Sequence, residues 1–396
     1  MSEMISLNKT VIGDSHLRHG IVCEDRSYSC EGEGTALVIA VADGHGDETC
    51  FRSAEGAAFA VSIATELMMG FTAAQESELE PRLRELSGEL VRRWREAVLK
   101  DAAERPFTED ELQKAGDHGE QLREGTCLAH AYGSTLIAAL RLEEHLLLMQ
   151  QGDGRCSVLF KDGAMEQPIP WDSACVANVT TSLCDEDADT AIRCAVLDTR
   201  GRPVAACWLS SDGVEDAYTD MEGTFSLLGE LTCRLAEEGR EPFLAYLDEF
   251  LPEFSRRGSG DDISLAVIAE LESCRALTEA LRARSERYSL GETLLRCEEK
   301  LISMSRKYEH LERRCNDRRE TLLGVFKKLT GGQRHPTEEA EPELDKLAEE
   351  YDSAWDEFDE YHGRYQSLRE EYERIKARMA ELSDVIDNRQ EGNSHE

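Results

Sequence analysis

Short apolar segments recur through the first 272 residues, and most of them end in a turn that contains aspartate and glycine. They are rich in β-branched residues, which is typical of strands, and Asp-Gly pairs are typical of tight turns. The clearest segments are TALVIAVADG, HLLLMQQGDG, CSVLFKDG, AACWLSSDG and DDISLAVIAEL. Helical spacing is seen between them at Ser53–Met69, Leu79–Ala103, Thr224–Ala236 and Glu241–Phe254. Because strands and helices come in blocks, the pattern favours an α+β sheet sandwich over a doubly wound sheet.

From about residue 273 onward, two long stretches carry apolar residues at alternating spacings of three and four. This heptad pattern is typical of coiled-coil helices. Between them, TGGQRHPTEEAEPE contains glycine and proline, which do not continue a helix. We therefore expect a globular domain at 1–272 and a helical region at 273–396, with helices at about 275–329 and 344–388 and a loop at about 330–343.

The charges of the two expected helices have opposite signs. Residues 273–330 carry about 14 basic and 9 acidic side chains, whereas residues 331–396 carry about 8 basic and 20 acidic ones. Opposite charges and heptad seams of similar length favour an intramolecular antiparallel hairpin. Arg318 lies on the first seam, and we expect it to reach the rim or to meet an acidic residue of the second helix. Dimerisation through these helices is the alternative.

The composition excludes several classes of function. With 81 acidic and 45 basic residues, the formal net charge is −36, which disfavours binding to nucleic acid or to an anionic membrane. No apolar stretch approaches the 18 residues of a transmembrane helix, and the first residues do not resemble a secretory signal. The 13 cysteines are odd in number and contain no C-x-x-C pair, which favours reduced thiols and a cytoplasmic protein.

Five acidic turns in the globular region contain the residues most suited to chemistry. They are Cys23-Glu24-Asp25, Asp43-Gly44-His45-Gly46, Gly152-Asp153-Gly154, Ser211–Asp216 and Gly260-Asp261-Asp262. Each places carboxylates at the end of an expected strand, where a glycine lets the backbone approach a ligand closely. Carboxylates that gather in one place repel one another and imply a compensating cation. Ligation by oxygen alone suits Mg²⁺ or Mn²⁺ rather than zinc.

Together these turns resemble the motifs of the metal-dependent protein serine/threonine phosphatases of type 2C. The family shows, in order, E-D, D-G-H-G, G-S-T, G-D-S-R, S-D-G-x-x-D and D-N. The corresponding positions here are Glu24-Asp25, Asp43–Gly46, Gly133-Ser134-Thr135, Gly152–Arg155, Ser211–Asp216 and Asp261-Asp262. The resemblance covers about residues 5–270, and S-H-x-x-x-G-x-x-C-E-D is similar to a bacterial branch in particular. It implies two antiparallel β-sheets flanked by helices and a phosphoprotein as substrate.

The resemblance also implies roles for individual residues. Asp43 would bridge two Mn²⁺ or Mg²⁺ ions, and a hydroxide between the ions would attack phosphorus. The other implied ligands are the Gly44 carbonyl, Asp212, Asp261 and Glu24, with Asp153 and Asp216 joining Asp212 at a third ion. His45 would protonate the departing serine or threonine oxygen, and Asp25 would orient it.

One departure from the family pattern concerns the substrate phosphate. Where the family commonly has an arginine that binds this phosphate, the chain has Gly20. The candidates to replace it are Arg18, Arg26, His16 and His19. The first hypothesis is an active phosphatase whose coiled coil binds a partner or a second copy. The alternatives are a phosphatase-like scaffold with little turnover, and an enzyme for a small phosphorylated metabolite.

Overall fold

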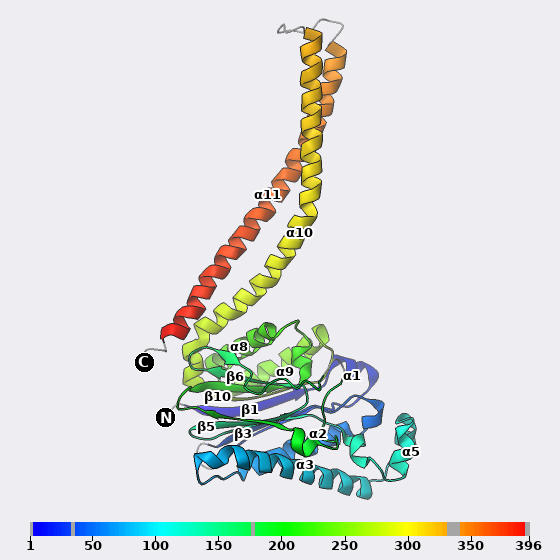
Figure 1. Ribbon diagram of the computed structural model, residues 1–396, viewed down its shortest axis with the longest axis vertical. Coiled ribbons are helices and arrows are strands. Elements are labelled where there is room, and N and C mark those ends of the chain that lie inside the picture. Colours follow the sequence, from blue (N-terminus) through cyan, green and yellow to red (C-terminus); the bar gives the residue numbers. More distant parts are fainter. Residues whose placement is uncertain (1–2, 33–35, 176–178, 331–340, 393–396) are drawn as a thin grey trace. The chain divides into compact units, whose positions relative to one another are not determined.

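The computed structural model describes residues 3–32, 36–175, 179–330 and 341–392 (Figure 1). The chain divides into two compact units, Met1–Ser285 with Ile386–Glu396, and Glu286–Val385. The first unit contains two β-sheets, and the second is helical. Within the described ranges, no helix is long and apolar enough to cross a membrane.

Each sheet has five strands, and all neighbouring strands are antiparallel. Across the first sheet the order is β1 (Met4–Val11), β10 (Ile263–Glu270), β9 (Val204–Ser210), β6 (Arg155–Phe160) and β7 (Met165–Glu166). Across the second it is β2 (Arg26–Glu31), β3 (Leu37–Ala42), β4 (Leu136–Arg141), β5 (His145–Gln151) and β8 (Arg193–Asp198). The expected sandwich of two antiparallel sheets is confirmed.

Helices cover the outer faces of both sheets, as Figure 1 shows. Against the second sheet lie α2 (Ser53–Met69) and α3 (Leu79–Glu104), and against the first lie α8 (Met221–Glu238) and α9 (Arg240–Arg257). These four helices correspond to the four that the spacing predicts. The shorter helices are α1 (Asp14–His19), α4 (Glu109–Lys114), α5 (His118–Arg123), α6 (Ala188–Ala191) and α7 (Asp212–Glu215), with 3₁₀ turns at Glu48–Cys50, Glu76–Glu78 and Leu128–Tyr132.

The central strands are apolar on both faces because each face is covered. In β3, Leu37, Ile39 and Val41 pack between the two sheets, whereas Val38 and Ala40 pack against α2 and α3. Successive side chains of a strand point to opposite faces, so a strand buried on both sides has a continuous apolar sequence. The run LVIAVA therefore lies in the centre of the molecule's first unit and ends beside the acidic turn at Asp43.

The first turn of α2 packs very closely on the backbone of Tyr132. A Cβ atom added to Gly56 would lie 1.9 Å from the Tyr132 carbonyl oxygen. The Gly56 carbonyl also accepts a hydrogen bond from the Trp94 indole N–H at 2.9 Å. We therefore expect Gly56→Ala to lower the free energy of unfolding by about 1–3 kcal/mol, the usual cost of overpacking, as measured by urea denaturation.

Gly88 in α3 is the matched control for this prediction. A Cβ atom there would meet its nearest neighbour, the Asp189 carbonyl oxygen, at 3.9 Å, which is an ordinary contact. Gly88→Ala should raise the free energy of unfolding by about 0.5–1 kcal/mol, because alanine favours the helix. Equal effects of the two substitutions would contradict the close packing of α2 on Tyr132.

The second unit, Glu286–Val385, is an antiparallel helical hairpin formed by most of α10 (Leu271–Thr330) and of α11 (Glu341–Gly392) (Figure 1). The Tyr308 and Tyr365 rings stack with centroids 4.9 Å apart, and Arg314 pairs with Glu357 at 2.6 Å. Arg318 pairs with Glu350 of the second helix at 2.5 Å, as the sequence predicts. The intramolecular hairpin is therefore confirmed.

The ends of the two helices differ from the expected bounds. α10 begins at Leu271, directly after β10, because Leu271, Cys274 and Leu277 pack into the apolar layer beneath α8 and α9. α11 begins at Glu341 and contains Pro342 in its first turn, where a missing N–H costs nothing. Of the predicted loop at about 330–343, residues 331–340 lie outside the described residues.

Candidate active site

The loop that follows β3 is held by the segment that precedes β4. The Asp43 N–H donates to the Thr135 hydroxyl at 2.9 Å, and the Thr135 N–H donates to the Asp43 carbonyl at 2.8 Å. The His45 N–H donates to the Gly133 carbonyl at 3.1 Å. The G-S-T motif therefore fixes the backbone of the D-G-H-G turn, which places Asp43 and His45 at the end of a buried strand.

A cavity of about 180 Å³ opens at this end of the sandwich. Most of the predicted site residues line it, although they come from turns far apart in the sequence. The lining residues are His16, Glu24, Asp43, Gly44, His45, Gly46, Thr135, Asp153, Thr180, Asp212, Asp261 and Asp262. The structure thus brings together the acidic turns that the sequence analysis identified.

Two predicted residues adjoin the lining. Asp25 is buried beside Asp43 and Asp212, with 1% of its surface exposed. Asp216 directly follows α7. Burial and the negative charges of Asp261 and Asp153 raise its pKa, so it lies close to the same carboxylate cluster.

Burial and mutual repulsion make this cluster electrostatically unfavourable in the absence of a cation. Burial first, and then the neighbouring carboxylates, raise the pKa of Asp25 to about 8 and that of Asp212 to about 7. The same causes raise the pKa of Asp43 well above its usual value. Oδ2 of Asp25 and Oδ1 of Asp212 are buried and accept no hydrogen bond within the described residues. Bound positive charge would lower all three pKa values.

The donor set fits a hard divalent cation. It consists of carboxylate and carbonyl oxygens, which are the preferred ligands of Mg²⁺ and Mn²⁺, and one of them, Oδ1 of Asp212, is buried with no hydrogen-bond partner within the described residues. Among the residues that the structure describes, no three Asp, Glu, His or Cys side chains are grouped as a closed metal centre.

The His45 ring faces the cavity and lies against backbone on its other side. A Cβ atom on Gly133 would lie only 2.6 Å from Cδ2 of His45, so glycine is required for this contact. Burial lowers the pKa of His45, and the negative charges of Asp153 and Asp185 oppose this effect. The predicted orienting contact with Asp25 is not among the described contacts of His45, because Asp25 points toward Ser211 and Asp43.

The sequence model described as Protein phosphatase 2C matches residues 12–252, more than half of the chain. The chain belongs to the protein phosphatase 2C family. The match includes every acidic turn except Asp261-Asp262, which lies beyond it. A comparison with curated proteins gave no match.

Several solved structures are similar to this member of the protein phosphatase 2C family. The serine/threonine phosphatase Stp1 from Staphylococcus aureus is 15% identical, covering 68% of this chain and 95% of that one, with a TM-score of 0.44. PppA, a key regulatory component of T6SS in Pseudomonas aeruginosa, is 19% identical over 68% and 98%, with a TM-score of 0.43. The catalytic domain of the serine threonine protein phosphatase PstP, in complex with two manganese ions, is 16% identical over 67% and 97%, with a TM-score of 0.39.

The Gly20 departure from the protein phosphatase 2C pattern has a local structural cause. Gly20 ends helix α1 with a φ of 69°, a left-handed conformation that favours glycine. An arginine at this position would strain the backbone. Helix α1 instead places His16 beside the acidic turn at Glu24.

Of the candidates for the substrate phosphate, only His16 lines the cavity. Its Nδ1 atom lies 3.0 Å from Oδ1 of Asp262, and its Nε2 atom lies 3.9 Å from Oε2 of Glu24. Arg18 is exposed and pairs with Asp14 at 2.5 Å, and His19 contacts the Ser15 carbonyl.

Arg26 has a structural role in the same region. Its Nη1 donates to the Cys23 and Asp25 carbonyls at 2.8 and 2.6 Å, so it holds the acidic turn rather than facing the cavity.

Asp262 has a role that the motif alone did not indicate. It is 3% exposed, and its carboxylate accepts hydrogen bonds from the Gly13 N–H at 2.6 Å and the Glu24 N–H at 2.7 Å. These two hydrogen bonds and the contact with His16 connect the start of β10 to three other segments. The segments are the residues after β1, helix α1 and the E-D turn. The replacement of the family asparagine by an aspartate at this position was the available signal.

Arg155 and Arg193 lie next to the Gly152-Asp153 turn and were not predicted. Arg155 is buried, pairs with Glu215 and stacks on the Trp171 ring at 3.9 Å. Arg193 donates to the Gly152 carbonyl at 2.6 Å. Arg193 therefore holds the turn that carries Asp153, whereas Arg155 joins the strand after this turn to Glu215, and the Arg of the G-D-G-R motif was the signal for Arg155.

Proposed function

We propose that this chain is a metal-dependent phosphoprotein phosphatase that hydrolyses phosphoserine and phosphothreonine. The observation that carries the proposal is one cavity lined by Glu24, Asp43, Asp153, Asp212 and Asp261, with His45 on the same lining. Membership in the protein phosphatase 2C family supports it. In this proposal residues 1–272 form the catalytic domain, and residues 273–396 form a helical region.

Two cations, Mn²⁺ or Mg²⁺, would be held by oxygens of the cavity. We assign the first to Asp43, Asp212 and Asp261, and the second to Asp43, the Gly44 carbonyl and Glu24. A third ion would use Asp153, Asp212 and Asp216. When bound, the ions supply the Lewis acidity that activates the attacking water and neutralises charge on the phosphoryl group.

Side chains of the cavity would position a ligand, donate a proton and bind the substrate phosphate. Ser53 donates to Oε1 of Glu24 at 2.8 Å and so holds this carboxylate in place. His45 would donate a proton to the departing serine or threonine oxygen. His16 would bind the substrate phosphate, and Asp262, whose Oδ1 lies 3.0 Å from Nδ1 of His16, would orient it. A phosphate dianion near His45 would favour its protonated form despite the lowered pKa.

A second candidate function is a phosphatase-like scaffold with little turnover. It is favoured by one observation: within the described residues, no arginine lines the cavity. The test is hydrolysis of a phosphoserine peptide by the full chain with Mn²⁺, compared with isothermal titration of Mn²⁺ alone. Hydrolysis supports the phosphatase, whereas Mn²⁺ binding without hydrolysis supports the scaffold. Turnover of small phosphorylated metabolites alone would favour a metabolite phosphatase.

We further propose a cytoplasmic location and a docking role for the hairpin. The location rests on the cysteine pattern, an odd number without C-x-x-C pairs. The docking role rests on the outer face of α10, where Leu295 and Ile302 are 63% and 67% exposed at a heptad spacing. Apolar side chains at this spacing are typical of a helix that packs on another helix.

Charge favours a second copy of the hairpin as the occupant of this face. Residues 286–330 carry 11 basic and 8 acidic side chains, whereas residues 341–385 carry 6 basic and 15 acidic ones. In a two-fold pair, the basic helix of one hairpin can lie against the acidic helix of its partner.

The double substitution Leu295→Glu with Ile302→Glu tests this self-association. Light scattering of the full chain should show a dimer, and the double variant should be a monomer. Leu99→Glu, which changes an exposed leucine of α3, should leave the dimer intact. High salt should weaken the dimer, because exposed charges are screened. A wild-type monomer at all concentrations would contradict self-association.

A further inference from the structure

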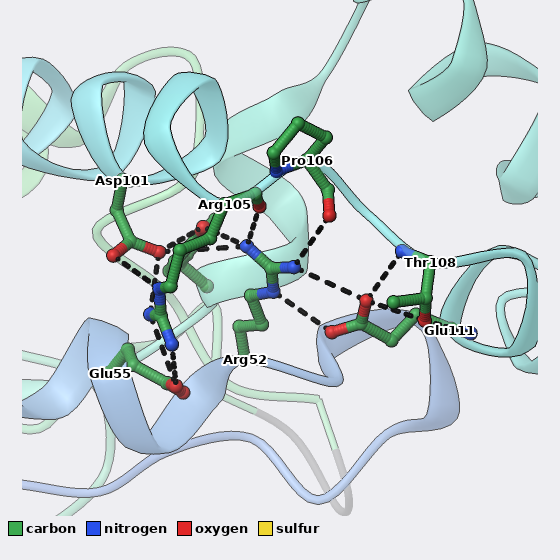
Figure 2. Close-up of polar contacts among 8 residues, drawn as sticks. Arg52, Glu55, Asp101, Arg105, Pro106, Thr108 and Glu111 are labelled. Carbon is green, nitrogen blue, oxygen red and sulfur yellow. Dashed lines mark hydrogen bonds and ion pairs between the residues drawn. The ribbon is translucent and has the colours of Figure 1, made fainter.

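Arg52 is a buried arginine whose partners come from two stretches of the chain, residues 101–111 and residues 131–132 (Figure 2). It directly precedes α2, lies seven residues after His45, and is 6% exposed. Its guanidinium donates to Oε1 and Oε2 of Glu111 at 2.9 and 3.2 Å, and to the Arg105 carbonyl at 2.7 Å. A longer bond of 3.4 Å reaches the Pro106 carbonyl.

The positive charge of Arg52 is compensated by two acidic residues, Glu111 and Asp101. Glu111 binds it in a bidentate fashion and is itself held by the Thr108 cap of α4, and Asp101 lies 3.6 Å away. The guanidinium also lies over the Phe107 ring at 4.6 Å. A lysine carries the same charge but cannot donate in so many fixed directions. The site therefore requires arginine for its geometry as well as its charge.

The remaining contacts of Arg52 lead to the segment that holds His45. Its backbone N–H donates to the Ala131 carbonyl at 2.8 Å, and its Nη1 donates to the Tyr132 hydroxyl at 2.9 Å. The next residue, Gly133, accepts the His45 N–H, and its backbone lies directly against the His45 ring. The backbone and the side chain of Arg52 thus each make one bond to the segment that carries Gly133, and the side-chain bond to the Tyr132 hydroxyl is the one that depends on the guanidinium.

We propose that Arg52 is a positioning residue for His45, acting through Tyr132 and Gly133. The proposal rests on the proposed function, in which His45 donates a proton to the leaving oxygen. A displacement of a reacting group by about 1 Å can cost about 10²-fold in rate. Release of residues 131–133 would permit such a displacement of the His45 ring, whereas the Asp43 backbone would stay held by its two hydrogen bonds to Thr135.

The test is Arg52→Lys in the full chain with Mn²⁺. We expect kcat/KM for a phosphoserine peptide to fall about 10²-fold, and kcat/KM for 4-nitrophenyl phosphate to fall much less, because its leaving group needs little protonation. Arg105→Lys is the control. Arg105 belongs to the same network through Asp101 and Glu55, Tyr132 is not among the described contacts of its side chain, and kcat/KM for both substrates should be unaffected.

A double-mutant cycle separates positioning from a general structural role. In a His45→Gln background, Arg52→Lys should cause no further loss on the phosphoserine peptide, because the group that it positions is gone. Equal losses on both substrates, or losses that add to those of His45→Gln, would overturn the proposal. If Arg52→Lys does not fold, Tyr132→Phe removes only the hydroxyl and is judged by the same criteria.

A readout without catalysis keeps this inference distinct from the proposed function. In chains with labelled histidine, the His45 ring signal can be assigned by its loss in His45→Gln. Arg52→Lys should shift or broaden that signal, and Arg105→Lys should leave it unchanged. An unchanged signal overturns the positioning role. Absence of hydrolysis by the wild-type chain with a shifted signal would reject the phosphatase proposal and keep the positioning one.

Discussion

Replacement of Asp43 with Asn is expected to abolish Mn²⁺-dependent hydrolysis. Asp43 lies at the end of β3 within the carboxylate cluster, and we assign it to both cations. An asparagine keeps the shape but removes the charge from the most shared ligand. Loss of a single donor to a transition-state charge costs about 10²–10³-fold, so we expect a fall in kcat/KM of more than about 10³-fold.

The fold should survive this substitution, and its stability provides the control. Repulsion from Asp25 and Asp212 contributes to the raised pKa of Asp43. Removal of this charge should therefore leave the metal-free chain at least as stable as the wild type at pH 8, measured by thermal unfolding. Mn²⁺ should raise the melting temperature of the wild type more than that of the variant. Substantial turnover by Asp43→Asn would show that the active site is assigned incorrectly.

Replacement of His45 with Gln should give the second largest effect. Loss of a general acid slows a reaction by about 10²–10⁴-fold when the leaving group needs a proton. We expect a loss of this size on a phosphoserine peptide and a much smaller loss on 4-nitrophenyl phosphate. The measurement is kcat/KM for both substrates at saturating Mn²⁺.

His130→Gln is the matched control for this experiment. His130 belongs to the same segment as Tyr132 and contacts the Thr49 hydroxyl at 3.0 Å, but it does not line the cavity. His130→Gln should lower kcat/KM slightly, and to the same extent for both substrates. If His45→Gln lowered the rates of both substrates to the same extent, His45 would have a structural role only.

The strands, the long helices and the acidic turns could be predicted because each is a local pattern. The run LVIAVA is apolar on both faces, and the heptad residues of α10 and α11 repeat at a fixed spacing. The acidic turns could be grouped because they resemble one ordered set of motifs. Arg318 could be assigned to an acidic partner because a charge on a seam needs one, and Glu350 provides it.

The detailed partners inside the site could not be predicted in this way. The orientation of His45 by Asp25 stays a prediction: Asp25 is buried near Asp43 and Asp212, and the described contacts do not join it to His45. The sequence offered four candidates for the phosphate, and only His16 lines the cavity. Which side chain faces the cavity depends on where α1 ends, and Gly20 ends it through a left-handed backbone conformation.

Local sequence patterns are sufficient to predict the sandwich, the hairpin and the set of acidic turns. Each depends on residues that are neighbours along the chain or repeat at a regular spacing. The residues that support these turns are far apart in the sequence and meet through tertiary packing. Arg52 and Tyr132 are 80 positions apart and Asp262 and Glu24 are 238 apart, and both pairs are joined by hydrogen bonds. Such contacts follow from how the two sheets and their helices pack, so no local pattern reveals them.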